Sequence, residues 1–230
     1  MNLLLPLACL SVLLVSCAPS APVHPTHDPP QPAHHHGMPH RFENAEQWAS
    51  VFDDPARDAW QKPEEVVRAM NLSPGMSIAD IGAGTGYFLP HLARAVGPSG
   101  KVVGVDIEPD MVRYINDRAS RDHLPNVHAV LTRPDDPGLP ERSVDRILIV
   151  DTWHHIPNRE TYAARLARTI TDDGMIFIVD FTLQSSHGPP RQHRLPPDVV
   201  IEELRRGGLD AQTIDVPLPD QYVVVARKRR

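Results

Sequence analysis

Short apolar runs alternate with amphipathic stretches along the chain from Phe42 onward. Apolar runs bounded by turn residues predict strands, and the longer amphipathic stretches predict helices. The run MIFIVDF at 175–181 is apolar on both faces, as expected of a strand that helices cover on each side. The pattern therefore predicts an α/β domain with a mostly parallel sheet. The expected strands are 77–81, 101–106, 127–131, 144–150, 175–181, 211–216 and 222–227.

The stretches between these runs predict helices near 87–96, 109–120, 159–170 and 197–206. An earlier helix is expected to begin at Pro63, because proline suits the first helical position and two acids follow in the first turn. Only five residues, PLPDQ, separate the last two expected strands. That connection is too short for a right-handed parallel crossover, so these strands must pair as an antiparallel hairpin.

The N-terminal segment begins with an apolar run at 3–15. As a helix this run would be about 20 Å long, shorter than the roughly 30 Å of hydrocarbon that a membrane-spanning helix must cross. It has the length of the apolar core of a secretory signal peptide, and it ends in LVSC. This ending resembles the lipobox of bacterial lipoproteins, in which the cysteine, here Cys17, is lipidated after cleavage. The resemblance implies a signal peptide at 1–16 and a lipid-anchored protein of the bacterial cell envelope; without use of the signal, the protein would be cytoplasmic.

Residues 18–40 are rich in proline and histidine and have no apolar periodicity. Such a segment cannot bury enough surface to offset its ordering entropy, so we expect a disordered linker. Its run His34-His35-His36 is favoured as a solvated spacer, with zinc, copper or nickel binding as the alternative. Residues 41–230 then form the folded domain.

Composition narrows the function of that domain. The chain carries a net charge of -6, which argues against a nucleic-acid partner because neutralising phosphates needs a basic face. Both cysteines, Cys9 and Cys17, precede the domain. A disulfide framework, a zinc knuckle and a cysteine nucleophile are therefore excluded from it, and no metal site is expected there.

The strongest chemical signal is a glycine-rich loop, Asp80-Ile-Gly82-Ala-Gly84-Thr-Gly86, which follows an expected strand and opens a helix. Glycines let the backbone turn tightly and approach a ligand more closely than a Cβ would allow. The spacing G-x-G-x-G differs from the G-x-G-x-x-G of dinucleotide sites. An acid at the entrance of the loop repels a pyrophosphate but accepts hydrogen bonds from a cationic or zwitterionic ligand.

A second signal is Asp106, the last residue of the expected strand 101–106. A carboxylate at this tip can accept hydrogen bonds from both ribose hydroxyls of an adenosine ligand. The alternative is an aspartate that caps the helix beginning near Pro109. With the glycine loop upstream, we favour ligand binding.

These motifs and three later ones resemble the successive motifs of class I S-adenosylmethionine-dependent methyltransferases. The matching stretches are DIGAGTGYF, VDIEPDM, DDPGLPERSVD, VDTWHHIPN and DDGMIFIVDF. The resemblance covers about residues 53–230 and implies a Rossmann-like three-layer sandwich. Its seven-stranded, mostly parallel sheet would end in an antiparallel C-terminal β-hairpin, and its cofactor would be S-adenosyl-L-methionine.

The resemblance also assigns contacts to the cofactor. Asp80, Gly82, Gly84 and Gly86 would frame its methionine part, and Asp106 would hold its ribose. These five residues belong to the first two motifs.

The later contacts come from three segments. Ile107 and Met111 would flank the adenine, and Asp136 or Asp135 would contact the adenine amino group. Asp151 opens the motif at the tip of the fourth strand, which in the family lies beside the transferable methyl group.

Methyl transfer from a sulfonium is a direct displacement, so holding the acceptor in line and excluding water supply most of the rate enhancement. A hydroxyl acceptor would also need a base, and His154 and His155 are the candidates. In the alternative, one imidazole packs on the sheet and the other caps the next helix. Trp153 is expected to form a wall of the acceptor pocket.

Together these features predict a methyltransferase that acts on a small-molecule acceptor and reaches the membrane through its lipid anchor. A different class of protein remains open, an envelope protein that binds an adenosyl ligand without turnover. An NAD-dependent oxidoreductase is disfavoured by the loop spacing and by the terminal hairpin.

Overall fold

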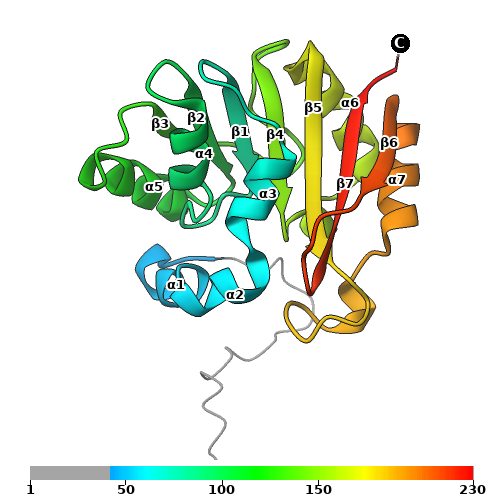
Figure 1. Cartoon of the computed structure of the whole chain (residues 1–230), viewed down its shortest axis with the longest axis horizontal. Coiled ribbons are helices and arrows are strands. Elements are labelled where there is room, and N and C mark those ends of the chain that lie inside the picture. Colours follow the sequence, from blue (N-terminus) through cyan, green and yellow to red (C-terminus); the bar gives the residue numbers. More distant parts are fainter. Residues whose placement is uncertain (1–41, 230) are drawn as a thin grey trace, which may run out of the picture. The chain divides into compact units, whose positions relative to one another are not determined.

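The computed structural model describes residues 42–229. The signal peptide expected at 1–16, the lipidated Cys17 and the linker expected at 18–40 lie outside the described residues. Within 42–229, seven strands form one sheet in the order β3-β2-β1-β4-β5-β7-β6 (Figure 1). The strands are β1 (Ser77–Ile81), β2 (Lys101–Asp106), β3 (Val127–Leu131), β4 (Val144–Val150), β5 (Ile170–Phe181), β6 (Leu209–Ile214) and β7 (Gln221–Lys228).

The direction of the strands confirms the expected fold class. The pairs along β3-β2-β1-β4-β5 are all parallel. β7 is antiparallel to both of its neighbours, β5 and β6, so the terminal hairpin lies with its second strand inside the sheet. This is the mostly parallel, seven-stranded sheet with an antiparallel C-terminal hairpin that the pattern predicted.

Helices cover both faces of the sheet. Their apolar stripes contribute to two separate buried clusters, one that includes α3, α4 and α5 and one that includes α6 and α7. The helices are α1 (Ala45–Phe52), α2 (Asp58–Gln61), α3 (Pro63–Ala69), α4 (Leu89–Val96), α5 (Pro109–Arg121), α6 (Arg159–Thr169) and α7 (Pro197–Arg206), with short 3-10 turns η1 (Pro55–Arg57), η2 (Trp153–His155) and η3 (Arg191–His193).

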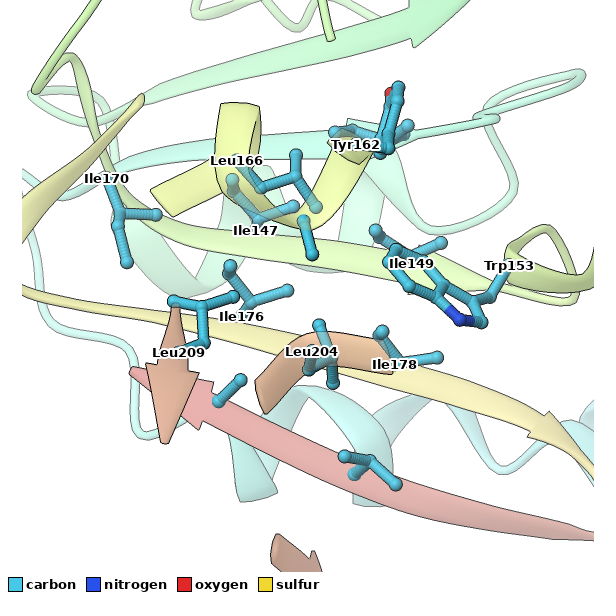
Figure 2. Close-up of a cluster of buried hydrophobic side chains, with 14 of the residues drawn as sticks. Ile147, Ile149, Trp153, Tyr162, Leu166, Ile170, Ile176, Ile178, Leu204 and Leu209 are labelled. Atoms are coloured by element: carbon cyan, nitrogen blue, oxygen red, sulfur yellow. The ribbon is translucent and has the colours of Figure 1, made fainter. Parts of the chain in front are cut away.

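The alternation of side chains along β4 explains why two clusters form. Ile147 and Ile149 belong to the cluster under α6 and α7, while Leu148 and Val150 belong to the cluster under α3, α4 and α5. Successive strand residues point to opposite faces, so a strand buried on both sides must be apolar throughout. Figure 2 shows the cluster under α6 and α7, in which Leu204 of α7 lies over the strands.

The bounds of the last three strands differ from the sequence prediction, and for β7 (Gln221–Lys228) the difference is one residue at each end. β5 begins at Ile170 instead of residue 175, because Ile170 pairs with Val144 and an irregularity between Val144 and Arg146 accommodates the extra residues. β6 begins at Leu209, where α7 has ended in a Gly207-Gly208 turn. The first four strands have the predicted bounds, so the loops at their carboxyl ends are also where we expected them.

The segment 42–62, here called the strap, contains α1, η1 and α2, which the sequence pattern did not predict. The side chain of Asn44 caps α1 by accepting a hydrogen bond from the backbone N–H of Gln47. The backbone N–H of Ala45 donates to Asp110 of α5 over 2.6 Å. Tertiary contacts of this kind hold the strap against the rest of the domain. Within 42–229 no helix has the length and apolar character that crossing a membrane requires.

Candidate functional site

Four aspartates mark the carboxyl edge of the sheet on four adjacent strands. Asp106 ends β2, Asp80 lies near the end of β1, Asp151 follows β4, and Asp180 lies near the end of β5. Parallel strands present their carboxyl ends at one edge, which is where open α/β sheets bind ligands. The sequence had singled out three of these residues, and the topology brings them together with the fourth, Asp180.

The glycine loop follows β1 with three residues in the left-handed region: Gly82, Gly84 and Gly86 have φ values of 71°, 56° and 81°. Residues with a Cβ rarely adopt this backbone conformation, whereas glycine adopts it readily. At Gly82 space is limiting as well, since a Cβ there would lie 2.3 Å from the side chain of Thr152. The turn therefore depends on close contact between the loop after β1 and the loop after β4.

Asp106 holds the glycine loop in place. Its Oδ2 accepts the backbone N–H of Gly84 over 2.8 Å, and its Oδ1 accepts the N–H of Glu108 over 3.0 Å. Burial raises the pKa of Asp106, and these backbone hydrogen bonds partly offset that rise. Each oxygen of a carboxylate has more than one lone pair, so both can still accept from a ligand hydroxyl. The carboxylate thus takes part in the turn before α5 and remains suited to a ribose.

The residues assigned to the adenine differ in accessibility. Ile107 is 45% exposed beside Asp106, whereas Met111 in the first turn of α5 is buried. The sequence analysis missed Leu131, the partner of Asp106 across the β2–β3 pair, which is 54% exposed. An apolar residue at the end of β3 was the signal that could have revealed it. Ile107 and Leu131 offer apolar surface at the carboxyl ends of β2 and β3.

The two acids considered for the adenine amino group lie in the loop after β3. The carboxylate of Asp136 accepts the backbone N–H of Gly138 over 2.9 Å, so it stabilises its own loop. Asp135 forms an ion pair with Arg165 of α6 at 3.2 Å. Asp135 is therefore held by α6, and Asp136 is the less exposed of the two.

The strap contacts the glycine loop directly. The hydroxyl of Thr85 donates to Asp53 over 2.9 Å, and Arg118 of α5 pairs with the same carboxylate at 2.9 Å. The ring of Phe52 lies 3.4 Å from the position that a Cβ on Gly84 would take. Residues from α1, the glycine loop and α5 thus form one contact region.

A chain of polar side chains continues from the strap to the other half of the edge. Gln61 accepts from Arg57 over 2.9 Å and donates to Gln221 over 2.6 Å, and Gln221 donates to Asp151 over 2.6 Å. The guanidinium of Arg57 closes the ring at 3.7 Å from Asp151. None of Arg57, Gln61 and Gln221 was predicted, because their sequence context carries no motif.

Two of the carboxyl groups at this edge titrate near neutral pH. Burial raises the pKa of Asp80 to about 7; the Arg57 guanidinium lowers it and Asp106 adds to the rise. Burial likewise raises the pKa of Asp151 to about 7, with Arg57 opposing and Asp180 reinforcing the effect. A cation bound at this edge would favour the ionised form of both groups.

The two candidate histidines lie in different environments on η2. Nδ1 of His154 lies 3.0 Å from Oδ2 and 3.1 Å from Oδ1 of Asp180, and both side chains are buried. His155 is exposed, with its ring 4.2 Å from that of His154 and 6.3 Å from that of Phe42. The sequence analysis did not consider Asp180, although an acid at the end of an apolar strand was a usable signal.

The expectation for Trp153 was wrong. Its side chain is fully buried, and its indole N–H donates to Glu203 of α7 over 2.9 Å. Figure 2 places it among the core residues, beside Ile149. Trp153 therefore anchors η2 to the core, and it does not line an acceptor pocket.

Residues 78–174 match the family model of a methyltransferase domain. This stretch is similar to a methyltransferase domain. It contains the glycine loop, Asp106, Asp151 and both histidines of η2. A solved S-adenosylmethionine-dependent methyltransferase from Aquifex aeolicus superposes with a TM-score of 0.74 at 26% identity, over 80% of this chain and 97% of that one.

Curated relatives match this chain over part of their length. Nocamycin O-methyltransferase of Saccharothrix syringae is 37% identical over 103 residues, which are 45% of this chain and 37% of that protein. Demethylmenaquinone methyltransferase of a Geobacillus strain is 23% identical over 146 residues, 64% of this chain and 62% of that protein. The chain thus spans 37% and 62% of the lengths of these two relatives.

The match to the family model and the fold imply S-adenosylmethionine as the cofactor of this chain. The donor set at the sheet edge fits this molecule, which carries a cationic sulfonium and an ammonium group. Buried carboxylates suit a cation, and a glycine loop in the left-handed conformation admits close backbone approach. Asp106 has free lone pairs for the ribose, and Ile107 has exposed apolar surface for the base.

Proposed function

We propose that the protein is an S-adenosylmethionine-dependent methyltransferase that acts on a small-molecule acceptor. The observation that carries this proposal is the glycine loop held to Asp106 at the carboxyl edge of a methyltransferase domain. When bound, S-adenosylmethionine supplies an activated methyl group. The names of the curated relatives, a nocamycin O-methyltransferase and a demethylmenaquinone methyltransferase, support a small-molecule acceptor.

The residues of this chain have separate roles in the proposal. Asp80 and the glycines at 82, 84 and 86 frame the methionine part of the cofactor, and Asp106 accepts hydrogen bonds from the ribose. Ile107 contacts the adenine from the exposed side, while buried Met111 supports that surface from beneath. Asp136 contacts the adenine amino group from the loop after β3.

The strap and η2 form the acceptor side. The carboxylate of Asp151 offsets the positive charge of Arg57, with which it pairs. Phe52 and Asp53 of the strap contact the glycine loop and exclude water from it. Holding the acceptor in line with the methyl group supplies most of the rate enhancement in such a displacement. A hydroxyl acceptor also needs a proton acceptor, for which His154 and His155 are placed on η2.

Calorimetric titration of the full chain tests the cofactor. S-adenosylmethionine and S-adenosylhomocysteine should bind, and NAD should not. The Asp106→Asn variant keeps a carbonyl acceptor but loses the charge, and a hydrogen bond to a charged group is worth about 1.5–3 kcal/mol, so affinity should fall about tenfold to a hundredfold. Asp215→Asn, at an exposed aspartate of the β6–β7 connection, serves as the control. Unchanged affinity in a folded Asp106 variant would remove this residue from the site.

Turnover separates the enzyme from a binding protein. Purified full chain and methyl-labelled S-adenosylmethionine should transfer label to an organic-soluble product when small-molecule extracts of the source cells are added. Cofactor binding without any transfer would make the protein an adenosyl-ligand-binding protein instead.

We also propose that Cys17 is lipidated and anchors the domain to the bacterial cell envelope. The support is the apolar run at 3–15 that ends in LVSC. The proline- and histidine-rich segment 18–40 would then link the anchor to the domain. If the signal is not used, the protein is cytoplasmic.

A further inference from the structure

The pair formed by His154 and Asp180 joins two elements that are separate in the sequence and adjacent in the fold. His154 lies on η2 after β4, and Asp180 lies in β5, the strand next to β4. Both carboxylate oxygens lie within 3.1 Å of Nδ1, and the two side chains are 5% and 1% exposed. Oδ1 of Asp180 also accepts the backbone N–H of Phe181 over 2.8 Å, which fixes the carboxylate in the strand.

This geometry selects one tautomer of the neutral imidazole. An ionised carboxylate only accepts hydrogen bonds, so the proton of His154 must lie on Nδ1. Nε2 then carries the lone pair and can take a proton. Among the described residues, the hydrogen bonds of His154 to other side chains run from Nδ1 to Asp180 alone. One nitrogen thus orients the ring, and the other can accept a proton. Sites that activate a nucleophile use the same pair of a carboxylate and a histidine.

Aromatic rings connect this histidine to the glycine loop. The ring of His155 lies 4.2 Å from that of His154 and 6.3 Å from that of Phe42. Phe42 lies 5.8 Å from Phe52, and Trp48 stacks on Phe52 at 5.3 Å. Phe52 reaches Gly84, as described above. We call Phe42, Trp48 and Phe52 the aromatic wall; all three are half-buried and therefore keep an exposed part.

An acceptor that lies against the aromatic wall would have the glycine loop at one end and His154 toward the other. Flat ring faces favour a planar aromatic ligand through stacking and edge contacts. A histidine held as a proton acceptor adds nothing for an amine that is already nucleophilic, whereas it activates a hydroxyl. The wall and the histidine therefore select the same class of acceptor.

We propose that His154 is the base that takes the proton from a phenolic hydroxyl of a planar aromatic acceptor, and that Asp180 is its positioning residue. This inference rests on the proposed methyltransferase function. The hydroxyl proton passes to Nε2 of His154 as the acceptor oxygen forms its bond to the methyl carbon. The carbon–sulfur bond breaks and its electron pair stays on sulfur, so the sulfonium becomes a neutral thioether. Asp180 stabilises the imidazolium, which then releases the proton to water.

The first test reads the tautomer and needs no acceptor. Full-length protein with ¹⁵N-labelled histidine is titrated until the His154 ring is neutral, and its proton is located by long-range ¹⁵N–¹H correlation. We expect the proton on Nδ1 in the wild type. In Asp180→Asn the amide can donate to Nδ1, so the proton should shift toward Nε2. A wild-type ring protonated on Nε2 overturns the proposal, whether or not the variant folds.

A matched control is available in the pair of His187 and Asp220, which is more exposed than that of His154 and Asp180 and whose Nδ1 and Oδ2 lie 3.0 Å apart. Asp220→Asn should change the tautomer of His187 and leave that of His154 unchanged. A shift of His154 in both variants would mean a general structural change, and it would count against a specific role for Asp180.

The second test uses 1-naphthol and its matched amine, 1-naphthylamine, as acceptors with labelled S-adenosylmethionine. We expect methylation of 1-naphthol, with kcat lowered about a hundredfold to ten-thousandfold in His154→Ala and in Asp180→Asn while the affinity for S-adenosylmethionine is unchanged. Methylation of the amine alone, no methylation of 1-naphthol despite bound cofactor, or full activity in Asp180→Asn overturns the inference. Absence of cofactor binding instead overturns the proposed function.

Discussion

Asp80 provides a test of the electrostatics of the sheet edge that is independent of any ligand. The residue is buried in β1 beside Asp106, and its pKa rises from 3.8 to about 7 because burial disfavours the charge. In the unfolded chain the carboxyl group ionises near its ordinary value. Between these two pH values the folded protein binds more protons than the unfolded chain, so the free energy of unfolding must fall as pH rises and then level off above pH 7.

The size of this effect follows from the pKa difference. Each unit of difference is worth about 1.4 kcal/mol, so the whole rise corresponds to about 4 kcal/mol, as an order of magnitude. Between pH 5 and pH 8 the contribution of Asp80 changes by about 3 kcal/mol on the same basis. Asp80→Asn has no proton to lose in this range. The stability of the variant relative to the wild type should therefore increase by about that amount from pH 5 to pH 8.

Urea unfolding followed by circular dichroism at several pH values measures this difference. The slope of the relative stability against pH is the readout, because a constant loss from the new amide leaves the slope unchanged. Asp151 contributes a dependence of the same sign to both proteins, so it cancels to first order. Asp215→Asn, at an exposed carboxylate, should run parallel to the wild type.

Parallel curves for the wild type and Asp80→Asn between pH 5 and pH 8 would refute the reasoning. They would mean that the carboxylate is ionised in the folded protein at the same pH as in the unfolded chain. Water or the Arg57 guanidinium would then solvate it well enough to cancel the effect of burial.

Three further outcomes are expected. Gly82→Ala should lower the melting temperature more than Gly97→Ala. Both positions have positive φ, but only at Gly82 would a Cβ meet a neighbour, Thr152. Equal losses in the two variants would show that the clash relaxes. The guanidinium of Arg194 donates to the backbone carbonyls of residues 182, 185, 187 and 189. Arg194→Ala should therefore lower the free energy of unfolding by about 1.5–3 kcal/mol or more and expose residues 182–190 to limited proteolysis. An unchanged cleavage rate would exclude this role. The Cys17→Ser variant should leave the membrane fraction or remain uncleaved, because stable anchoring needs two or more acyl chains. Mass spectrometry that finds a soluble chain with an unmodified Met1 would contradict lipidation.

Much of the fold could be predicted from the sequence because its signals are local. The apolar runs of β1 to β4 are bounded by turn residues, and the predicted bounds of these strands were correct. The short PLPDQ connection dictated an antiparallel hairpin, since a parallel crossover needs a longer chain. The glycine loop was recognisable because glycine adopts a left-handed backbone more readily than other residues do.

The strap could not be predicted in the same way. Its helices are short, and isolated helices of this length are unstable in water, so they form only with tertiary support. That support comes from residues far away in the sequence, such as Asp110 for α1 and Gln221 for Gln61. No local pattern records these partners.

The sequence by itself determined which residues can turn the backbone and carry charge: the glycines at 82, 84 and 86, and the aspartates at 80, 106 and 151. Only the tertiary structure decided what those charges face. Strand order places β4 between β1 and β5, which brings Asp180 to His154 and buries Trp153, and the strap brings Arg57 to Asp151. The physical reason is that hydrogen bonding and burial depend on distance in space, and crossover connections make that distance independent of separation along the chain.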